Sequence, residues 1–156
     1  MFQRSMLALM AVLTMIAAPV ELLETAHAGK GGSSRPFRGS GEGQAALIFV
    51  GDSPVGFAIE VGGNATHLGR FTRTEEVYFG PGGTIVGEME FRAANGDLLS
   101  ATAEGQFISE TEAIGTYTIT GGTGRFRSAT GGADFVATAG ADGTSLSIAF
   151  DGTISY

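Results

Sequence analysis

The sequence predicts an all-β protein: a small closed antiparallel barrel of about eight strands, preceded by a cleaved signal peptide. Apolar and polar residues alternate with a period of two, and turn signals recur at short, regular intervals. The chain also has 26 glycines, many of them inside the expected strands. Glycine weakens a flat strand but is tolerated where a sheet bends sharply, so this pattern favours a small barrel over a sandwich.

The N-terminal residues have the three parts of a secretory signal. Arg4 supplies positive charge, 6–20 is an apolar run, and Ala26 and Ala28 place small residues where a signal peptidase reads. The apolar run is shorter than the roughly 20 residues that a membrane span needs. We therefore expect cleavage after Ala28, a secreted or periplasmic protein, and no stable membrane insertion after cleavage.

The rest of the chain divides into a short leader and one domain. Residues 29–40 (GKGGSSRPFRGS) are small, polar and basic, which predicts a flexible leader, and 41–156 forms the barrel domain. The chain has no cysteine, so no disulfide holds the fold, and closure of the barrel would protect its strand edges instead. The formal net charge of −7 argues against a nucleic-acid or anionic-membrane partner, because both need a basic face.

The strands follow in order from this alternation. We expect less regular strands at roughly 43–50, 55–61 and 67–79. A hairpin follows over 83–108, with Asn95-Gly96 as its turn. The apolar face of the hairpin should form the interior: Ile85, Met89, Phe91, Leu99, Ala101, Ala103 and Phe107. Its polar face carries Glu88, Glu90 and Glu104, which we expect in solvent. Further strands are predicted at 114–120, near 133–137 and at 145–155, with Asp142-Gly143 before the last.

The glycine-rich stretch 115–132 (GTYTITGGTGRFRSATGG) is predicted to turn the sheet. Its glycine spacing fits neither a Walker loop nor a dinucleotide fingerprint, and no helix follows it to present an N-terminus to phosphate. We expect a turn at 121–124, after which Phe126 plugs the end of the barrel between exposed Arg125 and Arg127.

Within that stretch, 117–131 (YTITGGTGRFRSATG) resembles a segment of allene oxide cyclase-like barrels and plant dirigent proteins. Bacterial exported proteins of similar size carry the same segment, often with the ending Gly-Thr-Ile-Ser-Tyr found at 152–156. The resemblance implies an eight-stranded antiparallel barrel and, in the plant members, a homotrimer. It assigns none of the plant enzymes' active-site residues to positions of this chain.

The sequence carries no catalytic signature. His67 is the single histidine after cleavage, and neither a Gly-x-Ser-x-Gly elbow nor a cysteine is present, so we predict no catalytic residue, no metal and no cofactor. Whether the chain is an enzyme stays open, because an isomerase or cyclase is implied only by the resemblance. His67 either forms hydrogen bonds at the barrel rim or serves as an acid or base at the mouth of a cavity.

The predicted function is that of an exported binding module for a small apolar ligand held at the barrel mouth. The candidate ligand-binding residues are His67, Arg70, Tyr117, Arg125 and Phe126. The alternatives are a structural or interaction protein with a filled barrel, or a cyclase or isomerase by analogy. The inward phenylalanines distinguish these hypotheses: if Phe91, Phe107, Phe135 and Phe150 all point inward, the barrel is nearly full.

Overall fold

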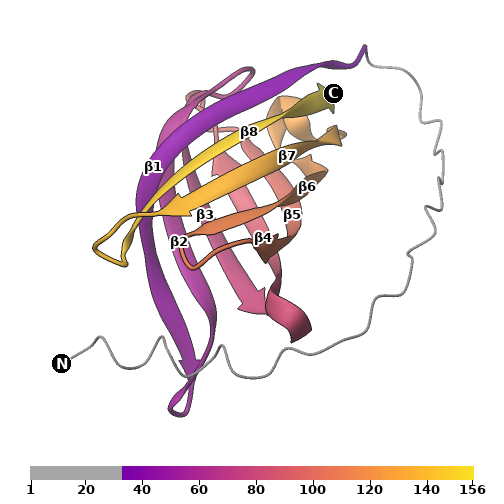
Figure 1. Cartoon of the computed structure of the whole chain (residues 1–156). Coiled ribbons are helices and arrows are strands. Elements are labelled where there is room, and N and C mark those ends of the chain that lie inside the picture. The colour runs from indigo at the N-terminus through magenta and orange to yellow at the C-terminus, as the bar shows by residue number, and fades with distance from the viewer. Residues whose placement is uncertain (1–32) are drawn as a thin grey trace. The chain divides into compact units, whose positions relative to one another are not determined.

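The computed structural model describes residues 33–156 and confirms a closed antiparallel barrel of eight strands (Figure 1). Each strand pairs with the next in the chain, and the last pairs with the first. The strands are β1 (Arg35–Val50), β2 (Ser53–Ala65), β3 (Gly69–Phe79), β4 (Thr84–Arg92), β5 (Leu98–Phe107), β6 (Glu112–Gly122), β7 (Thr130–Ala139) and β8 (Ser145–Ser155). Two 3-10 turns, η1 (Pro81–Gly83) and η2 (Gly124–Phe126), follow β3 and β6. The predicted signal peptide, 1–28, lies outside the described residues.

The first strand begins earlier than the sequence suggested. Residues 35–40, expected as part of the leader, form the start of β1 and pair with β8. Phe37 lies opposite Gly152 in this pairing and is fully buried. Because these residues close the barrel between its first and last strands, they belong to the folded domain.

The two ends of the barrel differ, and each is named here by its connections. The cap end is formed by the connections at 66–68, 93–97 and 123–129, together with Tyr156. The hairpin end is formed by the connections at 51–52, 80–83, 108–111 and 140–144.

Aromatic rings fill the half of the barrel next to the cap end. The ring centroids of Phe37 and Phe150 are 4.9 Å apart, and those of Phe71 and Phe91 are 5.4 Å apart. These four rings form one contiguous group, since Phe91 also contacts Phe150 at 5.8 Å. Such edge-on and tilted contacts are the favoured arrangements of aromatic pairs, so this half of the interior is a packed core.

Three of the four discriminating phenylalanines are buried, and one is not. Phe91, Phe135 and Phe150 are buried, whereas Phe107 is 41% exposed. Phe107 is the last residue of β5 and lies at the hairpin end, past the layer that the core fills. The expectation that it belongs to the buried face is therefore wrong.

Glycines leave room for a core side chain where β5 and β6 pair. Gly105 and Gly115 lie opposite each other in the register of these strands. A Cβ atom added at Gly115 would lie 2.2 Å from the carbonyl oxygen of Glu104 and 2.7 Å from Cε1 of Phe135. No larger residue fits at that position.

The hairpin of β1 and β2 extends past the rest of the barrel (Figure 1). β1 pairs with β8 only as far as Gln44, and β2 pairs with β3 only from Gly56. Beyond these points, residues 46–50 of β1 form ladder pairs only with β2, and residues 53–54 of β2 only with β1, with a register shift between Ile48 and Phe49. This segment, 46–54, projects from the hairpin end and is called the projecting hairpin.

Candidate functional site

A buried polar cluster lies inside the barrel, on the inward face of β3. Arg73, only 1% exposed, donates a hydrogen bond from Nη1 to the hydroxyl oxygen of Tyr117 on β6, at 2.6 Å. Its Nη2 lies 2.8 Å from Oε2 of Glu75. The guanidinium group also lies over the rings of Phe91 and Tyr117, 5.8 and 5.7 Å from their centroids. An ion pair and two aromatic faces thus hold this cation in the core.

Burial shifts the protonation equilibria of this cluster. It raises the pKa of Glu75 above its ordinary value of 4.5, and the nearby charge of Arg73 opposes that shift only in part. Burial also raises the pKa of the Tyr117 hydroxyl. Among the described residues, Nε of Arg73 has no acceptor, and Nη2 meets Glu75 outside hydrogen-bonding alignment. Buried donors without acceptors cost free energy, so these two nitrogen atoms of Arg73 reduce the stability of the fold.

This cluster was not predicted from the sequence, although the alternation of residues in β3 indicates it. In β3 the inward positions are Phe71, Arg73, Glu75 and Val77, all of them buried. The alternation therefore places a cation and a carboxylate two residues apart on an otherwise apolar face. Tyr117 approaches from the far side of the barrel, and no local pattern could have paired it with Arg73.

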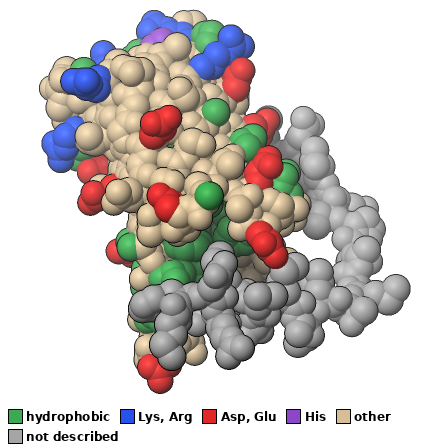
Figure 2. Space-filling view, turned by 60° about the vertical axis from the view of Figure 1, so that its left-hand side comes forward, with side chains coloured by type: hydrophobic (Ala, Val, Ile, Leu, Met, Phe, Trp, Pro, Cys, Tyr) green, Lys and Arg blue, Asp and Glu red, His purple; other side chains and the backbone are tan. Residues whose placement is uncertain are grey.

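Apolar side chains gather at the hairpin end. Ile59, Phe79 and Leu146 pack against the core but are only partly buried. The rings of Phe57 and Phe79 are 5.2 Å apart, and those of Phe79 and Phe107 are 6.2 Å apart. On the projecting hairpin, Leu47 lies opposite Phe57 and is exposed. Ile108 beside Phe107 is also exposed, and Figure 2 shows hydrophobic surface in this half of the molecule.

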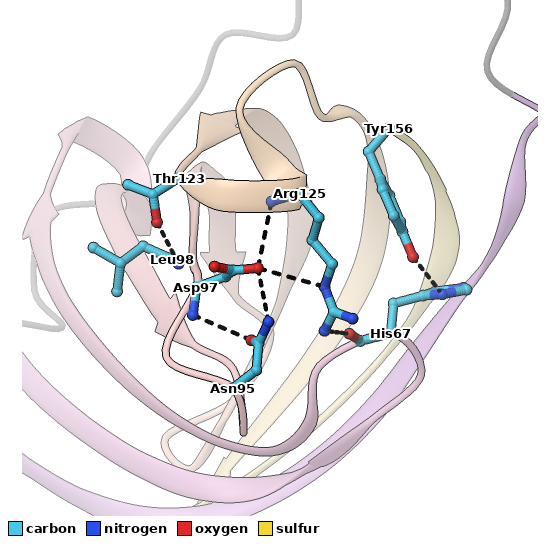
Figure 3. A network of polar contacts seen from close by, with 7 residues as sticks. All are labelled: His67, Asn95, Asp97, Leu98, Thr123, Arg125 and Tyr156. Carbon is cyan, nitrogen blue, oxygen red and sulfur yellow. Dashed lines mark hydrogen bonds and ion pairs between the residues drawn. The ribbon is translucent and has the colours of Figure 1, made fainter.

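Three of the five predicted site residues meet at the cap end. Nε2 of His67 lies 3.0 Å from the carbonyl oxygen of Pro36, to which it donates, and the hydroxyl of Tyr156 lies 3.1 Å from Nδ1. Arg125 donates from Nη2 to the carbonyl oxygen of His67 (Figure 3). Phe126 is fully buried, with its ring 5.1 Å from that of Tyr156. His67 is thus a rim residue that forms hydrogen bonds, one of the two alternatives weighed for it.

The other two predicted residues lie elsewhere. Arg70 is exposed on the outer face of β3, and Tyr117 lies in the interior, bonded to Arg73. His67 itself is in the turn before β3 rather than in the strand, with a φ of 66°. That left-handed conformation is uncommon for a non-glycine residue, although histidine adopts it more readily than most.

Asp97 anchors the cap-end connections to one another. Its carboxylate accepts hydrogen bonds from Nδ2 of Asn95 at 2.8 Å and from the backbone of Arg125 at 3.3 Å, and Nε of Arg125 lies 3.9 Å away (Figure 3). These contacts, chiefly the one from Asn95, lower the pKa of Asp97. Leu98 also donates its backbone N–H to the hydroxyl of Thr123 at 2.9 Å. The polar groups of this end therefore hold its loops together.

Within residues 33–156, no three histidine, aspartate or glutamate side chains gather as metal ligands. Over the same range, the structure has no helix of the length and apolarity that crossing a membrane requires.

Comparison with known proteins supports the architecture. No protein-family model matches the sequence. No curated protein matches it either. Among solved structures, the chain is similar to the pterocarpan synthase dirigent protein GePTS1, with a TM-score of 0.53 and 15% identity. The match covers 82% of this chain and 89% of that one. At this identity the likeness shows the fold alone: a barrel of the dirigent and allene oxide cyclase type, as the resemblance at 117–131 implied.

Proposed function

We propose that this dirigent-like barrel is an exported binding module that holds a small apolar ligand at its hairpin end. The observation that carries the proposal is the contrast between the two halves of the interior. Near the cap end, Phe37 and Phe91 are completely buried among other rings. Near the hairpin end, inward side chains such as Ile59 and Phe79 stay partly exposed. Apolar side chains that face an open mouth are typical of a site for an apolar ligand.

The proposed mouth is opposite the one that the sequence suggested. At the cap end, His67 and Arg125 are engaged in contacts that close the barrel, and Phe126 is buried. At the hairpin end, Leu47 and Phe107 have apolar surface free to cover a ligand.

The ligand best suited to this mouth has an apolar body and one acceptor oxygen. Going inward from the mouth along β3, Phe79 is followed by Val77 and then by Glu75, which is 7% exposed. Glu75 adjoins Arg73, whose Nε has no acceptor among the described residues. A few polar groups beneath an apolar rim commonly set the orientation of a bound ligand.

Native mass spectrometry tests the proposal. The exported protein is recorded before and after extraction with organic solvent, together with two variants. We expect the wild type to carry extra mass that extraction removes. Leu47→Ser combined with Phe107→Ser should weaken the affinity for this ligand by about tenfold or more, since a buried apolar side chain contributes about 1.5–3 kcal/mol. The control, Val136→Ser, removes an exposed apolar side chain on β7 and should leave the extra mass unchanged. A wild-type protein without bound mass would contradict the proposal.

A second candidate function is self-association through the projecting hairpin. Val50 is 70% exposed and Phe49 is exposed beside it, on a stretch of β1 that β8 does not cover. An uncovered strand edge with apolar side chains is a common surface for association, and the resemblance implies a homotrimer in the plant members. In the same spectra, a trimer that Phe49→Ser converts to monomer would support this function. A wild-type monomer at micromolar concentration would exclude it.

A further inference from the structure

Arginines gather at the cap end of this acidic protein. Of the seven arginines in residues 33–156, the six with exposed side chains belong to this end, and the seventh is the buried Arg73. They are Arg35, Arg38, Arg70, Arg92, Arg125 and Arg127. Figure 2 shows basic side chains concentrated at this end, with acidic ones mainly on the outer surface of the barrel below it. The cap end therefore has a basic surface although the formal net charge is −7, contrary to the expectation that the chain lacks a basic face.

The positions of these arginines follow from the strand register and the cap contacts. Arg92 lies opposite Thr72 in the pairing of β3 with β4, which makes Arg70 its diagonal neighbour on the outer face. Arg125 is held against the turn at His67, and the backbone oxygen of Arg38 accepts the N–H of Thr66 in the same turn. The arginines thus extend from neighbouring segments rather than from scattered sites.

Most of these arginines have no acidic partner within the described chain. Arg38 pairs with Asp151 at 2.8 Å, and Arg125 lies 3.9 Å from Asp97. Among residues 33–156, no carboxylate lies within ion-pairing distance of the other four arginines: Arg35, Arg70, Arg92 and Arg127. Four like charges on one surface repel each other, and a polyanion would relieve that repulsion.

We propose that the cap end binds a soluble acidic polysaccharide that carries carboxylate or sulfate groups. All of these cations are guanidinium groups, which bind such oxyanions through two parallel hydrogen bonds. The large exposed apolar side chains of the described chain lie elsewhere, on the projecting hairpin, at the end of β5 and on outer strand faces, so this end lacks the apolar residues that would insert into a membrane. Tyr156 packs against His67 and Phe126 and is therefore not free to stack on bases. The export that the N-terminus predicts also favours an extracellular polymer over a nucleic acid.

Isothermal titration calorimetry with two oligosaccharides tests the proposal, one from heparin and one from polygalacturonate. At low salt we expect binding whose affinity falls steeply as salt is added. Arg70→Gln with Arg92→Gln should weaken binding by about tenfold or more and reduce the dependence on salt. The matched control, Gln44→Glu with Gln106→Glu, makes the same change in net charge at exposed positions in the other half of the barrel. The control should change the affinity by less than about threefold.

Three outcomes would overturn the proposal. The first is no binding of either oligosaccharide by the wild type at low salt. The second is an equal loss in the arginine variant and its control, which would mean that only net charge matters. The third is tighter binding to phosphatidylglycerol vesicles or to double-stranded DNA than to either oligosaccharide. The proposal does not depend on the hairpin-end ligand, because the two sites are at opposite ends of the barrel.

Discussion

Glu75 is a carboxylate enclosed in an aromatic interior, and two opposing effects act on its pKa. Its desolvation favours the neutral form, whereas the Arg73 guanidinium 2.8 Å away favours the charged one. Desolvation is the larger effect, so the pKa of Glu75 is raised in the folded state. The free energy of unfolding should therefore include a contribution from Glu75 that is complete below pH 4.5 and is lost as the pH rises through the raised pKa.

Glu75→Gln isolates this contribution, because glutamine resembles the protonated carboxyl in shape. At low pH we expect the variant and the wild type to have similar free energies of unfolding. As the pH rises above 4.5, the variant should gain stability relative to the wild type, since only the wild type must ionise a buried group. Urea unfolding between pH 4 and pH 8 measures this difference. A relative loss of stability in the variant at high pH would show that attraction to Arg73 outweighs desolvation.

At the scale of elements, β5 and β6 leave room for a core ring because neither has a side chain where Gly105 and Gly115 pair. The ring of Phe135 packs against the bare backbone of Gly105 and Gly115. Gly62 on β2 provides a contrast, because a Cβ atom there would meet only the carbonyl oxygen of Phe71, at 3.9 Å. The two kinds of strand glycine therefore have different structural roles.

Gly115→Ala should destabilise the fold, and Gly62→Ala should not. Overpacking of a core typically costs about 1–3 kcal/mol, which for a domain of this size lowers Tm by at least about 3 °C. The alanine at position 62 has room and should leave Tm unchanged or raise it slightly, because glycine in a strand loses more conformational entropy on folding. Differential scanning calorimetry of both variants checks this. Equal Tm changes would mean that the Phe135 contact does not restrict position 115.

At the scale of the whole molecule, the barrel has two chemically different ends separated by a packed core. The cap end presents arginines, and the hairpin end presents apolar side chains on the β1–β2 hairpin and at Phe107. In the cap-end half, Phe37, Phe71 and Phe91 are almost completely buried, so that half of the interior is packed. The two proposed sites should therefore act independently.

Exchanging the variants between the two assays tests this independence. Arg70→Gln with Arg92→Gln should leave the extractable mass in native spectra unchanged. Leu47→Ser with Phe107→Ser should leave the oligosaccharide affinity within about twofold of the wild type, because rigidly separated sites couple weakly. A loss of both activities in either variant would contradict the separation of the two ends.

Features that depend on residues near one another in the chain could be predicted from the sequence. Features that depend on how distant strands meet in the closed barrel could not. The hairpin turn at Asn95-Gly96 was predictable, and Gly96 has the positive φ that such a turn requires. Tyr117 meets Arg73 across the interior, a contact between non-adjacent strands that no local periodicity encodes. The exposure of Phe107 depends on where the core ends, which alternation within β5 does not reveal.

The most direct test of the hairpin-end site is to map where an uncharged apolar probe binds. Amide chemical shifts of the ¹⁵N-labelled protein would be recorded during titration with N-phenyl-1-naphthylamine, whose neutrality avoids attraction to the arginines of the cap end. We predict saturable shifts confined to the projecting hairpin at 46–54, to Phe79 and to Phe107 with Ile108. Shifts centred on His67 and Arg125, or no saturable shifts, would contradict the account.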